Sequence, residues 1–188
     1  MALLILGVAL FTLLHLVPIF ATETRASVVS RISENGYKAL YSLATFSAFY
    51  FIYKGWTLSE VTFLYSPPSW SPHATALLVL IGFVLFFSSR APTNIKRYIR
   101  HPQLAGLACW AAGHLLSNGE TRSVILFAGL GVWSVIAMLG SNRRDGEWIK
   151  PESQSLAKDI VTIVIGLALY IGFAFWAHEF LFGMRPFP

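Results

Sequence analysis

The stretch ALLILGVALFTLLHLVPIFA, at positions 2–21, runs for 20 residues without an Asp, Glu, Lys or Arg. An α-helix needs about 20 apolar residues to cross the hydrocarbon layer of a bilayer. No basic segment precedes this stretch and no small-residue cleavage site follows it. We therefore interpret it as a retained membrane helix rather than a signal peptide.

The rest of the chain has the same character. Of its 188 residues, 55% are hydrophobic and 12% are charged, whereas soluble domains carry about 25% charged residues. We predict an all-α integral membrane protein, a bundle of about six transmembrane helices forming a single domain over residues 1–188. The predicted segments are Ala2–Ala21, Gly36–Trp56, His73–Arg90, Pro102–Asn118, Arg122–Leu139 and Leu156–Phe182. The fourth is the weakest candidate, because it is short and holds two glycines and a histidine.

Positive charge predicts the orientation of the chain. Eleven of the 14 Lys and Arg residues fall in segments 21–38, 90–101 and 141–158, which share one side if six helices cross. Basic residues concentrate in cytoplasmic loops. We expect both termini to lie on the non-cytoplasmic side, and the net charge of +5 to reflect topology rather than nucleic-acid binding.

Two of the five histidines, His15 and His114, lie deep in apolar segments. An imidazole in hydrocarbon is costly, so it needs a hydrogen bond, a water or a metal. One interpretation is a hydrogen bond to a neighbouring helix. Because the spans hold almost no other polar partners, we favour ligation of a haem iron, which histidine often holds. The other three histidines are expected at interfaces or a helix start, at His73, His178 and His101.

The depth of His15 and His114 in the membrane bears on whether the two can bind one haem iron. Counted from Arg25 and Arg100, His15 and His114 lie about 15 and 21 Å deep at 1.5 Å per residue, so both are near mid-membrane. If the first helix enters the bilayer at Phe20 instead, the two cannot share one iron. Pro18 is expected to kink the first helix near His15.

The fourth segment carries further candidate residues. Small and aromatic residues share a face with His114 by helical spacing, and the glycines among them allow close approach by a flat macrocycle or by a neighbouring helix. Arg100 and its basic loop are candidates to bind haem propionates or anionic lipid headgroups. Alternatively, their positive charge acts only as a topology signal. The residues on this face are Gly106, Trp110, Gly113, His114 and Ser117.

Other kinds of chemistry fit less well. Zinc needs three or four N or S ligands, and Cys109, the single cysteine, lies five residues before His114 and on another helix face. No carboxylate pair, nucleophile–base pair or phosphate loop is visible. The only acidic residues in the spans are Asp159 and Glu179, at the ends of the last one, so a carboxylate-driven pump is not expected.

Two signatures resemble the NnrU family of bacterial membrane proteins. One runs RHPQLAG from Arg100 to Gly106, followed by Trp110 and then GHLLSNG from Gly113 to Gly119. The other is His15 followed by ENGYKALYSL from Glu34 to Leu43. The resemblance covers about residues 1–180. It implies a multi-pass protein of the bacterial inner (cytoplasmic) membrane that is associated with denitrification and nitric oxide metabolism.

The NnrU family is in turn similar to plant 15-cis-zeta-carotene isomerase, a b-type haem enzyme of membranes. By motif, His15 and His114 fall at positions that resemble its two haem ligands. The isomerase has a cysteine three residues before the second histidine, where this chain has Ala111. The resemblance thus implies haem b, with nitric oxide or a polyene as the ligand, and leaves a ligand-exchange role for Cys109 in question.

The resemblance agrees with both enzymatic and non-enzymatic functions. A haem protein, a haem-dependent carotenoid isomerase and a non-enzymatic assembly factor that partners a membrane reductase or electron donor all agree with the resemblance. The Arg100-His101-Pro102 motif also resembles membrane methyltransferases. Their later polar, cofactor-binding stretch is replaced here by the apolar span Leu156–Phe182, which argues against that activity.

Overall fold

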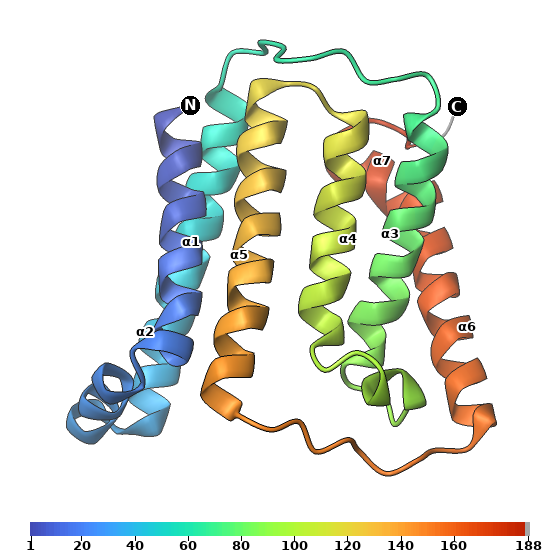
Figure 1. Ribbon diagram of the computed structural model, residues 1–188. Helices are drawn as coiled ribbons and strands as arrows, with labels where there is room; N and C mark the ends of the chain where they lie inside the picture. The colour runs from blue at the N-terminus through green and yellow to red at the C-terminus, as the bar shows by residue number, and fades with distance from the viewer. Residues whose placement is uncertain (187–188) are drawn as a thin grey trace. The chain divides into compact units, whose positions relative to one another are not determined.

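The computed structural model describes residues 1–186, and these confirm the all-α fold (Figure 1). All six predicted segments are helical, and the last continues through a π-helical stretch into a short final helix. The elements are α1 (Ala2–Phe20), α2 (Thr22–Leu58), α3 (Ser71–Ser88), η1 (Asn94–Arg97), α4 (Pro102–Ser117), α5 (Thr121–Asp145), α6 (Leu156–Gly172), η2 (Phe173–Ala177) and α7 (His178–Phe182).

Among residues 1–186, four stretches are long and apolar enough to cross a membrane. They are α1, α3, α5 and the run Leu156–Phe182. Many large apolar side chains on them are exposed, such as Leu13, Ile160 and Val164, which suits contact with lipid. Helix α4 has 16 residues, or about 24 Å, less than the roughly 30 Å hydrocarbon layer. A full crossing by α2 and α4 therefore stays a prediction.

The chain forms two compact units, each assembled from segments distant in sequence. Unit 1 contains Met1–Tyr65 and Gly119–Gly146, with helices α1, α2 and α5. Unit 2 contains Ser66–Asn118 and the chain from Glu147, with the remaining elements. The single domain expected from the sequence stays a prediction.

Glycines let the helices of unit 1 approach closely. A Cβ atom at Gly7 of α1 would lie 2.6 Å from the backbone nitrogen of Ile52 in α2. A Cβ atom at Gly129 of α5 would lie 2.5 Å from Cγ1 of Val8 in α1. Small residues at helix contacts are the usual means of packing helices in a membrane, where dispersion must replace the hydrophobic effect. These contacts fix α1 between two neighbours and so set where His15 points.

Helix α2 is kinked at Ser33. This residue has φ 67° and ψ 165°, a left-handed value that is unusual for a residue other than glycine. Its hydroxyl accepts a hydrogen bond from the backbone N–H of Gly36, 3.3 Å away, as an N-cap does. Across the kink, Arg25 donates to Glu34 at 2.8 Å. The kink separates a charged first part from the predicted apolar segment Gly36–Trp56.

Unit 2 also depends on close helix contacts. A Cβ atom at Gly106 of α4 would lie 2.6 Å from the carbonyl oxygen of Gly82 in α3. A Cβ atom at Gly166 of α6 would lie 2.9 Å from Cα of Val84. Helix α3 is thus packed against both α4 and α6, and these three helices surround the pocket described below.

The start of α6 is tied to the turn η1. Asp159 accepts hydrogen bonds from the hydroxyl of Thr93 at 2.6 Å, from the backbone N–H of Asn94 at 2.7 Å and from the Asn94 side chain at 2.7 Å. This accounts for an acidic residue at the end of an apolar span, because its charge is matched by three donors. Asp159 therefore has a structural role, as a clamp between η1 and α6.

Candidate functional site

His15 lies on α1 with its ring orientation fixed by the backbone. Its Nδ1 is 2.8 Å from the carbonyl oxygen of Phe11, one turn earlier. A carbonyl only accepts hydrogen bonds, so Nδ1 carries the proton and the lone pair of the neutral ring is on Nε2. This is the tautomer that binds a metal through Nε2.

Aromatic rings from three helices surround His15. Phe11 stacks on the imidazole with 4.0 Å between ring centroids, while Tyr41 of α2 and Trp133 of α5 each contact it edge-on at 5.4 Å. Trp133 also meets Phe11 edge-on at 5.1 Å. We call Phe11, His15, Tyr41 and Trp133 the His15 cluster. Its rings hold the imidazole in one orientation, as a metal ligand requires.

A series of side chains leads from the His15 cluster toward the charged part of α2. The rings of Tyr41 and Tyr37 are 6.0 Å apart. The guanidinium of Arg25 lies over the Tyr37 ring, 5.1 Å from its centroid. The side chains of Tyr41 and Tyr37 therefore connect the His15 cluster with the cationic Arg25. This positive charge favours a negatively charged group at that end of the cluster.

His114 lies on α4 in unit 2 and is fixed in the same way. Its Nδ1 is 2.9 Å from the carbonyl oxygen of Trp110, one turn earlier, so this ring also has its lone pair on Nε2 when neutral. The ring centroids of His114 and Trp110 are 4.8 Å apart. The two histidines singled out by the sequence thus share one geometry, although they belong to different units.

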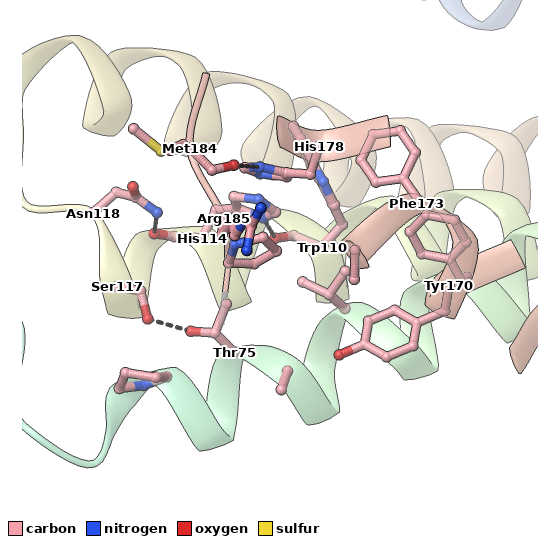
Figure 2. Close-up of a pocket in the computed structure, with 16 residues that line it drawn as sticks. Thr75, Trp110, His114, Ser117, Asn118, Tyr170, Phe173, His178, Met184 and Arg185 are labelled. Atoms are coloured by element: carbon pink, nitrogen blue, oxygen red, sulfur yellow. Dashed lines mark hydrogen bonds between the residues drawn. The ribbon is translucent and has the colours of Figure 1, made fainter. Parts of the chain in front are cut away.

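A pocket of about 300 Å³ in unit 2 is lined by His114. Figure 2 shows Tyr170 and Phe173 toward one end of it and Asn118 toward the other. Its walls combine aromatic rings with a few polar groups, as small-molecule sites usually do. Other lining residues include Thr75, Phe83, Trp110, Ser117, His178 and Arg185.

His178 is the pocket residue that sequence analysis missed. The sequence suggested an imidazole at the membrane interface, but its side chain lines the same pocket as His114 (Figure 2). Its Nδ1 is 2.9 Å from the carbonyl oxygen of Met184, which gives it the same tautomer. The π-helical segment η2 directly precedes it. Such segments occur often at functional sites, but hydropathy gives no sign of them.

The glycines on the His114 face contact a neighbouring helix. Gly106 meets Gly82, and a Cβ atom at Gly113 would lie 3.2 Å from Cβ of Leu78, also in α3. Of the two explanations offered by the sequence, close helix packing is the one the structure shows. The predicted contacts of Gly106, Gly113 and Arg100 with a cofactor stay predictions. Trp110 lies in the pocket wall.

The described histidines do not belong to a cluster of three or more metal ligands. Among residues 1–186, no group of three or more His, Cys, Asp and Glu side chains is placed to hold a metal ion. Structural and catalytic zinc sites need such a group, whereas haem iron needs at most two axial side chains because the porphyrin supplies four nitrogens.

Comparison with known protein families decides the affiliation. The model of the NnrU family, described as NnrU protein, matches residues 3–186. The chain belongs to the NnrU family. No curated protein and no solved structure matches this NnrU chain. The resemblance found in the two signatures is thus confirmed, while the relation to the plant carotenoid isomerase stays a prediction.

Proposed function

We propose that this NnrU protein binds haem b in the bacterial inner membrane, with His15 and His114 as ligands of the iron. The proposal includes a role in denitrification or nitric oxide metabolism and termini on the non-cytoplasmic side. The observation that most directly supports the proposal is that the two histidine side chains have the same hydrogen-bond geometry. In both, a backbone carbonyl one turn earlier accepts a hydrogen bond from Nδ1–H, so the lone pair of the neutral ring is on Nε2.

The chain's own residues have distinct tasks in this proposal. Phe11, Tyr41 and Trp133 hold the His15 ring, and Trp110 packs against His114. The aromatic rings also keep water from the iron ligands and lower the local dielectric, which tunes the reduction potential. Haem, when bound by His15 and His114, would supply one-electron redox chemistry and would be able to bind a diatomic gas.

A second candidate is a haem-dependent isomerase of a polyene. The pocket in unit 2 favours it, because Phe83, Trp110 and Tyr170 give the walls an aromatic surface suited to a flat conjugated chain. In this reading His114 again binds haem and the pocket takes the lipid. Expression in a host that accumulates a cis-carotene tests it, and an unchanged isomer ratio would exclude it.

Absorbance spectra test the main proposal. Protein purified in detergent is compared as wild type, His15→Ala, His114→Ala and the control His73→Ala, which changes an exposed histidine. We expect sharp low-spin bands in wild type and the control, and weak or high-spin bands in the two ligand variants. Folded wild-type protein without a Soret band after haem supplementation contradicts the proposal.

A further inference from the structure

Trp133 carries a buried donor for which the described residues offer no acceptor. Its side chain is 8% exposed, and its indole Nε1 has no hydrogen-bond partner anywhere in the part of the chain that the structure describes. A buried tryptophan N–H is normally paired. Trp133 is the thirteenth of the 25 residues of α5, so in a bilayer its surroundings offer no bulk water in place of a partner.

The position of this donor connects it with His15. The two ring centroids are 5.4 Å apart and the ring planes are inclined by 78°. Phe11 packs against both rings, at 4.0 Å from His15 and 5.1 Å from Trp133. The cluster therefore holds a nitrogen lone pair on His15 and a buried donor on Trp133 at neighbouring positions. One bound group that carries both a metal and an oxygen acceptor would satisfy the two together.

The charges around the cluster indicate what kind of oxygen this is. Tyr41 and Tyr37 lead from His15 to Arg25, whose guanidinium lies over the Tyr37 ring. Arg25 and Lys38 both pair with Glu34. With Arg31 and Glu23, this part of α2 carries three cations and two anions. The series of rings that starts at His15 ends at this cationic part of α2, which favours an anionic acceptor, because charge-assisted hydrogen bonds are the strongest ones.

We infer that the indole N–H of Trp133 forms a hydrogen-bonding subsite for a carboxylate of the group bound at His15. This rests on the proposed function, since haem b carries two propionate carboxylates. A polyene hydrocarbon has no oxygen to accept the bond. The subsite therefore selects haem over a hydrocarbon at this position.

The experiment compares two porphyrins in matched variants. Trp133→Phe keeps an aromatic ring and removes the donor. Trp56→Phe is the control, because Trp56 lies in the same unit but packs against Phe127 and Arg122 rather than the His15 cluster. Each protein is loaded with haem b or with an iron porphyrin that lacks propionates. The rate of loss to a haem-scavenging globin is then followed by absorbance.

We expect Trp133→Phe to lose haem b about 10- to 100-fold faster than wild type, as removal of a hydrogen bond to a charged group predicts. Loss of the propionate-free porphyrin should be the same in both, and Trp56→Phe should match wild type throughout. Trp133→Tyr restores a donor, so its rate of haem b loss should lie between those of wild type and Trp133→Phe. If the phenylalanine variant does not fold, the tyrosine variant is compared with wild type instead.

Two results overturn the inference while leaving the proposed function intact. One is an equal rate of haem loss in wild type and Trp133→Phe, and the other is faster loss of both porphyrins to the same degree, which would mean that Trp133 acts by packing alone. Folded wild type that takes up neither porphyrin removes the proposed function and the inference together. The two failures are therefore distinguishable.

Discussion

The hydroxyl of Thr75 on α3 donates a 2.7 Å hydrogen bond to the carbonyl oxygen of Gly113 on α4, the residue directly before His114. The same hydroxyl lies 2.6 Å from that of Ser117. A polar contact of this kind between apolar helices fixes both their register and their rotation. Thr75 thus helps to set the direction in which His114 enters its pocket.

Substitution of Thr75 by valine should destabilise unit 2. The change keeps the shape of the side chain but leaves the Gly113 carbonyl without this donor, so we expect a loss of about 1 kcal/mol. Denaturant titration in detergent, followed by circular dichroism, measures it. Ser47→Ala is the control, because the Ser47 hydroxyl donates to the Leu43 carbonyl within its own helix. Equal stability of Thr75→Val and wild type would show that the contact contributes little.

Alanine at Gly106 should disrupt the contact between α3 and α4. The new Cβ would lie 2.6 Å from the Gly82 carbonyl oxygen and 3.0 Å from the Phe86 backbone nitrogen, and backbone atoms cannot move aside cheaply. We expect a loss of about 1–3 kcal/mol, typical of overpacking. Thermal unfolding in detergent provides the measurement.

Gly172 supplies the matched control for that substitution. Nothing lies within 4 Å of a Cβ atom built there, and the residue ends α6 with helical dihedral angles. Gly172→Ala should therefore stabilise the protein by about 0.5–1 kcal/mol, because alanine loses less backbone freedom than glycine on folding. If both variants shifted stability in the same direction, the helix contact at Gly106 would not explain the first result.

Loss of the Asp159 carboxylate should loosen the turn η1. In Asp159→Ala, the hydroxyl of Thr93 and two N–H groups of Asn94 lose their acceptor. We expect faster trypsin cleavage after Lys96 and Arg97, which lie in this turn. Mass spectrometry of the fragments identifies the sites. Glu152→Ala, which removes an exposed acidic residue, should leave the cleavage rate unchanged, and no acceleration in Asp159→Ala would refute the clamp.

Reporter fusions should confirm the predicted orientation. Because eleven of the 14 basic residues fall in the segments 21–38, 90–101 and 141–158, we expect these segments to face the cytoplasm. Alkaline phosphatase, active only outside the cytoplasm, should be active when fused after the last residue and inactive when fused within 90–101. The opposite pattern would reverse the topology, and activity at both positions would mean an even number of crossings between them.

The sequence by itself determined the helices and the candidate ligands. Apolar runs such as that of α1 specify helices because only internally bonded backbone is stable in lipid, and Pro102 marks the start of α4 because its missing N–H costs nothing there. His15 and His114 stood out because an imidazole in such an apolar run is costly unless a hydrogen bond, a water or a metal satisfies it. All of these signals are local, so they can be read along the chain.

Only the tertiary structure decided what surrounds those histidines. Trp133 meets His15, and His178 joins His114 in one pocket, although each pair is separated by at least 60 residues in the chain. Such contacts depend on how each helix is rotated and how closely it approaches its neighbours, which Gly7, Gly106 and Gly129 set through packing. Hydropathy records that a residue is apolar and not which residue it faces. The Trp133 N–H, which has no partner among residues 1–186, therefore becomes visible only after the helices have packed.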